Sequence, residues 1–488
     1  MSKTLNPVRG FTVGSALVLA VICMPMQRAA YASDVTWTNG SANFQWDTSS
    51  LNWNTGAWNN ANGDGAIFNA TGAGSLSLMG PINVNSLNFT VDGYALNGVG
   101  PLNIVNGSST QTTGVVNVTT GTAKVNVPIN SSLGFQKIGN GILELSASNS
   151  FSGGIGLDGR NTLVADLLVG GAGGLIPSGT LRVTSGSVIP ASTRVSLSDG
   201  FLDIGNNNVT VSQLIFPNQN DFVVWNPAIN AAGCGVIGTG TLRVLGDINV
   251  IGVSGGNSGS NTIAANLDLG GGTQVVRTAQ QGSAGLYSSL QFSGTLSNGS
   301  LLKAYGTSFN GVQAQADGIA LYGNNTYTGS TRLNGGFNVV TGTNATTSVE
   351  VAGSSTGGSV ISLQGANGSL QSATTIQAVA GSALVLDNNA ALGSGQFNPA
   401  IPAAQNNNRI RDDAEVQLRD GSFTYRGLST AAATETFGKL NVTGGFNTVT
   451  LAPTGTGGTA TLTASGDLSL APRSTLLVST ATIGAASK

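Results

Sequence analysis

Short apolar stretches with a strict alternation recur along the chain, separated by residues that favour turns. Leu181 and Val183 flank Arg182, and the same arrangement of Leu, Arg and Val returns at residues 242–244. Successive side chains of a strand point to opposite faces, so this alternation predicts strands that each bury one face. We therefore expect an all-β chain of many short strands, joined by turns rich in Asn, Thr, Ser and Gly.

Two segments of the chain repeat one another, which indicates a repeat architecture rather than ordinary domains. These two segments are residues 141–159 and 318–335. A second, shorter unit, Gly-Thr-Leu-Arg-Val, occurs at 179–183 and again at 240–244. No such unit can bury its apolar face alone, whereas stacked coils bury it inside a β-solenoid. The alternative is a pair of β-sandwiches, and the repeats favour the solenoid. In the longer units, Leu145, Asn149, Phe151, Gly153, Leu157 and Gly159 match Leu321, Asn325, Tyr327, Gly329, Leu333 and Gly335.

The N-terminal segment, 1–32, has the pattern of a secretory signal. Lys3 and Arg9 precede an apolar stretch over residues 11–25, and Ala30 and Ala32 fit the small-x-small cleavage pattern. The stretch is shorter than the ~20 residues that span a bilayer. We expect cleavage after Ala32, and no membrane span remains once the signal is removed.

The composition agrees with a turn-rich exported chain and excludes one class of function. The 488 residues include 72 Gly and no His, and 8% are charged, against roughly 25% in ordinary domains. The net charge of −2 gives no basic face for a nucleic-acid partner. After signal removal Cys234 is the remaining cysteine, which precludes an intramolecular disulfide. No basic residue neighbours it in sequence to activate the thiol, so a small buried side chain is the favoured interpretation.

The Asn-x-Phe/Tyr-x-Gly unit between Leu-rich strands resembles the autotransporter-associated β-strand repeat. The opening segment, Trp37-Thr-Asn-Gly40 through Asp64-Gly-Ala-Ile-Phe68, is similar to the opening of proteins with that repeat. The resemblance implies a bacterial exported protein with a right-handed parallel β-helix and a passenger-like surface role. The translocator barrel of autotransporters does not follow the repeats here, so we expect release, a separate anchor, or a truncated remnant of a longer protein.

The expected layout has three parts. Residues 1–32 form the signal peptide, 33–100 an N-terminal cap and the first coils, and 101–488 the β-solenoid. The repeat units lie near 137–165 and 315–343 within that solenoid.

Carboxylates are the catalytic groups to consider, because a chain without His has no His-based triad or zinc site. The densest charged stretch runs from Arg409 to Arg426, and its Asp412 and Asp413 lie among arginines. This balance predicts a salt-bridged loop without a raised carboxyl pKa. We expect no catalytic residues, no metal and no cofactor. A polysaccharide-degrading β-helix enzyme is the alternative.

Four tryptophans, Trp37, Trp46, Trp53 and Trp58, gather near the mature N-terminus. Indole faces stack on sugar rings, which would make the cluster a carbohydrate contact. The favoured interpretation is an aromatic cap, because the first coil of a solenoid has an open apolar end. The expected protein is a structural or adhesive one, secreted or at the cell surface. Its expected partners are extracellular polysaccharide, matrix or cell-surface components.

Overall fold

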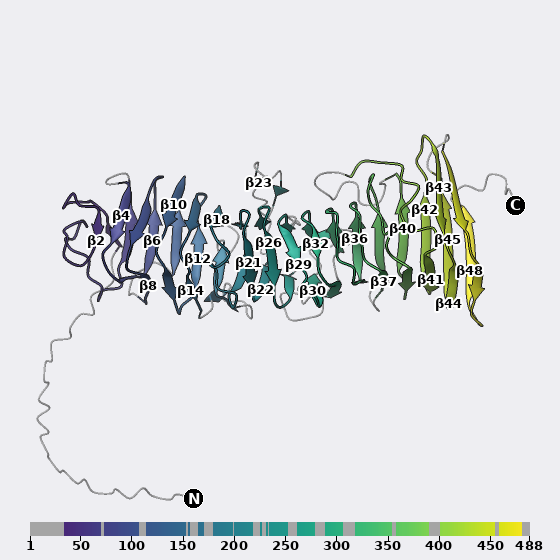
Figure 1. Ribbon diagram of the computed structural model, residues 1–488, viewed down its shortest axis with the longest axis horizontal. Coiled ribbons are helices and arrows are strands. Elements are labelled where there is room, and N and C mark those ends of the chain that lie inside the picture. The colour runs from purple at the N-terminus through teal and green to yellow at the C-terminus, as the bar shows by residue number, and fades with distance from the viewer. Residues whose placement is uncertain are drawn as a thin grey trace, which may run out of the picture.

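The computed structural model describes residues 34–69, 73–106, 114–152, 155–156, 164–169, 179–198, 200–217, 225–226, 231–232, 234–251, 261–278, 288–305, 318–353, 358–389, 401–453 and 458–480. The expected signal peptide and the cleavage point after Ala32 lie outside them. The described chain winds into a rod of stacked coils, from the first strands at one end to β48 at the other (Figure 1). None of the described residues forms a helix with the length and apolarity that crossing a membrane requires.

One strand of each coil belongs to a long parallel sheet, called here the first sheet. It has 17 strands among the described residues, and each pairs with the equivalent strand of the next coil. The strands are β1 (Asp34–Thr36), β3 (Gly65–Phe68), β6 (Ser86–Phe89), β9 (Val115–Val118), β12 (Phe135–Ile138), β17 (Leu167–Val169), β19 (Arg194–Leu197), β22 (Gln213–Pro217), β27 (Ile248–Ile251), β30 (Thr273–Thr278), β33 (Ser300–Tyr305), β35 (Ser330–Asn334), β37 (Ser348–Ala352), β39 (Thr375–Val379), β41 (Glu415–Arg419), β44 (Leu440–Gly444) and β47 (Leu468–Leu470).

The next strand of each coil belongs to a second parallel sheet, here the second sheet, built in the same way. Its strands are β2 (Gln45–Trp46), β4 (Ser75–Leu78), β7 (Ala95–Gly98), β10 (Thr122–Val125), β13 (Ile142–Leu145), β18 (Thr180–Val183), β20 (Phe201–Asp203), β25 (Gly235–Ile237), β28 (Asn261–Ile263), β31 (Ser288–Phe292), β34 (Gly318–Leu321), β36 (Gly336–Val340), β38 (Ser359–Leu363), β40 (Ala383–Asp387), β42 (Ser422–Arg426), β45 (Phe446–Ala452) and β48 (Thr475–Thr480).

A shorter, interrupted third face closes the coil before the chain returns to the first sheet. Two hairpins also leave the coils, β15 (Ile155–Gly156) with β16 (Val164–Ala165), and β23 (Trp225–Asn226) with β24 (Ala231–Ala232). The third-face strands are β5 (Ile82–Val84), β8 (Leu102–Ile104), β11 (Ile129–Ser131), β14 (Ser150–Phe151), β21 (Asn208–Val211), β26 (Thr241–Val244), β29 (Asn266–Asp268), β32 (Leu296–Ser297), β43 (Ala432–Phe437) and β46 (Thr459–Ala464).

This arrangement confirms the predicted right-handed parallel β-helix. Parallel strands joined by crossovers adopt the right-handed connection in about 98% of cases. The pairing of β7 with β10 carries the second sheet through the expected division at residue 100 without a break. With 17 coils spaced by ~4.8 Å, the rod is roughly 80 Å long.

The core is a set of apolar columns that run along the rod axis. In the first sheet, Val195 pairs with Leu214, which pairs with Ile248, and all three side chains are fully buried. Each side chain therefore packs on the equivalent side chain of the next coil, and burial of apolar surface stabilises the stack.

The coils differ widely in length while their strands stay in register. In the first sheet, Thr331 pairs with Val349 of the next coil, and Ile376 pairs with Val416. The chain segment between Ile376 and Val416 is more than twice as long as the segment between Thr331 and Val349. Within the described residues, the longer segment includes residues 401–414 between β40 and β41, which add no strand to either long sheet.

The longer repeat predicted from sequence begins at one position in the coil, although its Gly153, Leu157 and Gly159 lie outside the described residues, and the shorter repeat does not occupy one position. Leu145 and Leu321 both end strands of the second sheet. The two Gly-Thr-Leu-Arg-Val units differ, because Thr180–Val183 lies in the second sheet and Thr241–Val244 on the third face. Alternation determines which side chains are buried, but it does not distinguish the three faces of a β-helix.

Candidate functional site

The four tryptophans form the predicted aromatic cap over the first coil. Trp46 lies 4.9 Å from Trp53, and Trp53 lies 4.7 Å from Trp58 and 5.7 Å from Phe68, between ring centroids. All four indoles are buried, with at most 3% of each residue exposed. Sugar stacking needs an exposed ring face, and none of Trp37, Trp46, Trp53 and Trp58 offers one in this structure.

The sequence predicts a salt-bridged loop from Arg409 to Arg426, and the structure differs over much of that stretch. Residues 415–419 and 422–426 form β41 and β42, which are strands of the first and second sheets. Asp413 forms an ion pair with Arg411. The pKa of the Asp413 carboxyl lies below its usual value, because Arg411 donates hydrogen bonds to it. A general acid needs a raised pKa, so Asp413 does not have the property of one.

Arg409, in contrast, is fully buried, and its guanidinium ties its own coil to the preceding one. Its guanidinium donates to Asn388 Oδ1 and to the carbonyl oxygens of Gly365 and Gly368, each at 2.9 Å. These bonds satisfy a charge that burial would otherwise penalise heavily. Arg409 therefore fixes the turns of its long coil to the body of the rod.

Glu435, which the sequence analysis did not single out, lies buried beside Arg409. Its carboxylate accepts the backbone N–H groups of Arg409 at 2.9 Å and Ile410 at 3.0 Å. Burial raises the pKa of Glu435 to about 7, against the lowering effects of these hydrogen bonds and of the Arg409 charge. The pair is enclosed by the fold, which gives it a structural role.

Charged side chains on the outer surface are paired from coil to coil. Lys124, Glu144, Arg182 and Asp203 occupy one register position on four successive strands of the second sheet. Their ion pairs measure 3.2, 3.8 and 2.9 Å in that order. We call this row the charge ladder; it alternates in sign and has no net charge.

The described residues contain no group of three or more His, Cys, Asp or Glu side chains that could hold a metal ion. Cys234 is buried, as predicted, and its thiol donates to the carbonyl oxygen of Leu197 at 3.2 Å. Lys137 is buried as well, and its ammonium group donates to Ile138 O and Gly139 O at 2.8 Å each. Burial lowers the pKa of Lys137 to about 7.

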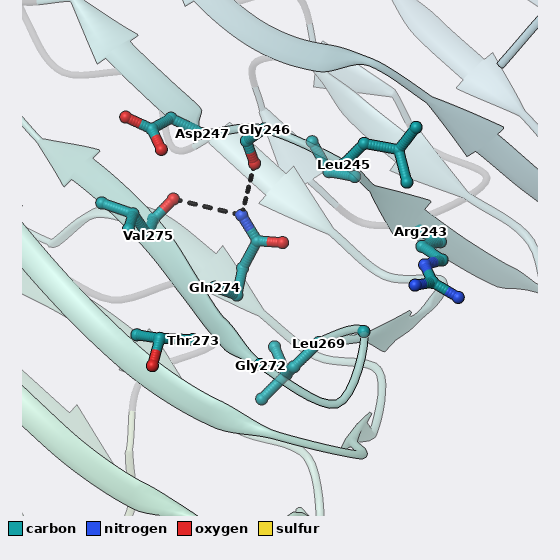
Figure 2. Close-up of a pocket in the computed structure, with 11 residues that line it drawn as sticks. Arg243, Leu245, Gly246, Asp247, Leu269, Gly272, Thr273, Gln274 and Val275 are labelled. Atoms are coloured by element: carbon teal, nitrogen blue, oxygen red, sulfur yellow. Dashed lines mark hydrogen bonds between the residues drawn. The ribbon is translucent and has the colours of Figure 1, made fainter. Parts of the chain in front are cut away.

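One open groove lies on the surface at the corner between the third face and the first sheet. It has a volume of about 200 Å³ and spans the turn after β26 and the turn after β29 (Figure 2). The amide nitrogen of Gln274 donates to Gly246 O at 2.8 Å and Val275 O at 3.2 Å, and these bonds fix the side chain on the groove floor. Leu245 and Arg243 lie on one side of the groove (Figure 2). No sequence pattern indicates this groove, because it depends on which turns stack on one another.

Comparisons with known proteins bear on the role of this rod. No model of a known protein family matches the chain, and no solved structure matches it. A stretch of 210 residues, 40% of this chain, is 31% identical to "Adhesin BmaC autotransporter" of Brucella suis biovar 1 (strain 1330). The match covers 5% of that adhesin, so the chain spans a small part of its length. The similarity supports an autotransporter passenger-like relationship, while membership of the associated β-strand repeat family stays a prediction.

Proposed function

We propose that this protein is an exported, non-enzymatic adhesive rod with a passenger-like role at the bacterial surface or in the medium. The observation that carries the proposal is the similarity of a parallel β-helical chain to an autotransporter adhesin. A stack of coils presents a long surface while its core needs only local contacts. Such a surface suits many weak contacts with polysaccharide, matrix or cells.

The proposal is tested with the purified chain coupled to beads. We expect these beads to remain on bacterial cells, epithelial cells or polysaccharide-coated glass under flow, well beyond beads that carry serum albumin. Equal retention of the two kinds of bead on every surface would contradict an adhesive role. Export is tested separately by N-terminal sequencing of the protein recovered outside the cytoplasm, which we expect to begin at Ser33.

The absence of enzymatic activity is part of the proposal and needs its own experiment. The protein is incubated with a panel of acidic and neutral glycans, and reducing and unsaturated ends are measured. We expect none to form. Release of ends that Asp412→Asn combined with Asp413→Asn abolishes would overturn this part of the proposal.

A further inference from the structure

The groove at the corner after β26 and β29 exists because successive turns differ in length. One residue, Ser212, joins β21 to β22, whereas residues 245–247 join β26 to β27. Residues 269–272 make the next turn longer still, and residues 298–299 make the following one short again. Residues of both long turns line the hollow.

Gly270 and Gly272, two members of a run of three consecutive glycines, line this hollow, and the three are glycine for different reasons. Gly270 and Gly271 have φ values of 78° and 76°, in the left-handed region that disfavours other residues. Gly272 does not have a positive φ, and a methyl group placed on its α-carbon would meet no heavy atom within 4 Å. Neither backbone conformation nor crowding requires glycine at 272. Its effect is to keep the wall free of a side chain.

The remaining groups combine an apolar contact with hydrogen-bonding groups. Leu245 is 59% exposed, which is unusual for leucine in this structure, and gives the groove an apolar side. Gln274 is buried, and its carbonyl oxygen points away from its two hydrogen-bond acceptors toward the side where Arg243 lies (Figure 2). A fixed acceptor and a nearby guanidinium donor thus flank the apolar surface of Leu245.

The charges around the groove balance. Arg277 pairs with Asp247 at 2.6 Å, and the guanidinium of Arg243 lies 3.9 Å from the carboxylate of Asp268. Two arginines and two aspartates give no net field to select an ionised ligand. The groove therefore suits a neutral, amphipathic ligand with several hydroxyl groups.

We propose that this groove is a subsite for one neutral pyranose ring of a surface polysaccharide. The inference rests on the proposed adhesive function and names the class of ligand. A volume of about 200 Å³ is below the ~300–1,000 Å³ of pockets for drug-sized molecules, which matches a single sugar ring. The C–H face of the ring packs on Leu245, and its hydroxyl groups bond to Gln274 Oε1 and Arg243. One ring in an open groove binds with a Kd on the order of 1 mM, and repetition along a polymer adds avidity.

Saturation-transfer NMR on the full chain tests the subsite, with glucose, galactose, mannose, N-acetylglucosamine and, as the acidic member, glucuronate as probes. We expect transfer to at least one neutral sugar. Gly272→Val fills the groove without straining the backbone, and Leu245→Ser removes the apolar contact from an exposed position. Each should weaken binding at least tenfold.

Gly80→Val is the matched control, since Gly80 also lacks a positive φ and has no heavy atom within 4 Å of a methyl group placed on it. It should bind the sugar as the unchanged protein does. Absence of transfer from every neutral sugar, transfer confined to glucuronate, or full binding by Gly272→Val would each overturn the subsite.

The subsite and the adhesive function fail in different ways. Beads that adhere although the protein binds no neutral sugar would leave the adhesive function standing and reject the subsite. Sugar binding without adhesion would reject the adhesive function and leave the subsite standing.

Discussion

Asn325 and Leu296 lie on adjacent coils, and the side-chain Oδ1 of Asn325 accepts the backbone N–H of Leu296 at 2.9 Å. Asn149 does the same in the other repeat unit, where its Oδ1 accepts the N–H of Ile129 at 2.8 Å. Leu296 and Ile129 each begin a strand of the third face. The asparagine of the repeat thus supplies the hydrogen bond that a neighbouring strand would otherwise provide.

Replacing Asn149 by Ala should therefore destabilise the protein by about 1–3 kcal/mol, since the N–H of Ile129 would remain buried without an acceptor. Hydrogen exchange measured by mass spectrometry should show faster exchange in the peptide that contains Ile129. Asn130→Ala is the control, because Asn130 is exposed and its replacement should change stability by no more than ~0.5 kcal/mol. Equal protection of Ile129 in Asn149→Ala would contradict this role.

Trp46 lies at the centre of the cap, and its replacement by Ala should cost about 3–5 kcal/mol through lost burial and the cavity left behind. Thermal unfolding followed by circular dichroism measures the change. Leu51→Ala provides a nearby comparison, because Leu51 is exposed and should tolerate truncation with little change. A small effect of Trp46→Ala would mean that the cap does not hold the first coil.

The same cap allows a direct test of the carbohydrate prediction for the tryptophans. Because the four indoles are buried, their fluorescence should neither shift nor quench when soluble glycans are added to the folded protein. Intrinsic tryptophan emission is recorded across a glycan titration. A saturable change that Trp58→Phe removes would instead support a sugar contact at the cap.

Glu435 should make stability depend on pH near neutrality. Its folded pKa of about 7 lies above the ordinary value of 4.5, so between these values the folded state holds a proton that the unfolded state has released. The corresponding stability is present below about pH 4.5 and is lost as the pH rises through about 7. The Arg409 charge and the two backbone N–H groups lower the pKa of Glu435, and the Asp412 charge raises it.

Denaturant unfolding at pH 5 and pH 7 measures the effect, because the opposing titration of Lys137, whose pKa burial lowers to about 7, acts mainly above pH 7. The free energy of unfolding should fall over this interval by a few kcal/mol, roughly as a pKa difference of this size implies. Glu435→Gln cannot ionise and should flatten the dependence. An equally steep dependence in Glu435→Gln would assign the titration to another group.

The charge ladder should contribute little through any one pair. Glu144→Gln should lower stability by less than about 1 kcal/mol, because its partners are partly exposed. Glu144→Lys should lower it further, since a cation would then lie between Lys124 and Arg182. Unfolding in 50 mM and 500 mM salt tests this, and the difference between the two variants should shrink at high salt. A difference that salt leaves unchanged would argue against an electrostatic cause.

Much of the fold follows from the alternation of apolar residues, and some of the buried charges could have been identified by the same signal. Ala433, Glu435 and Phe437 are alternate residues of one strand and all face the core. A charged residue at such an inward-facing position predicts a buried charge. Lys303 lies in the same phase as Leu301 and is buried, with its ammonium group bonded to backbone carbonyls.

Other features could not be predicted, because they depend on which residues of distant segments come to lie side by side. Arg409 donates to the carbonyl groups of Gly368 and Gly365, which are far from it in sequence, and no local pattern near it indicates these partners. The groove is similar, since it arises where a turn of three residues lies beside a turn of four. Sequence gives the length of each turn, whereas the hollow depends on how neighbouring turns stack.

The variation in coil length has a consequence for how such a protein can change. The chain segment from Ile376 to Val416 is more than twice as long as the segment from Thr331 to Val349. All four residues nevertheless occupy one register position of the first sheet. An insertion or deletion at a corner therefore leaves the paired strand residues on either side in register. Surface features can therefore be gained, lost or exchanged one corner at a time, without repacking of the core.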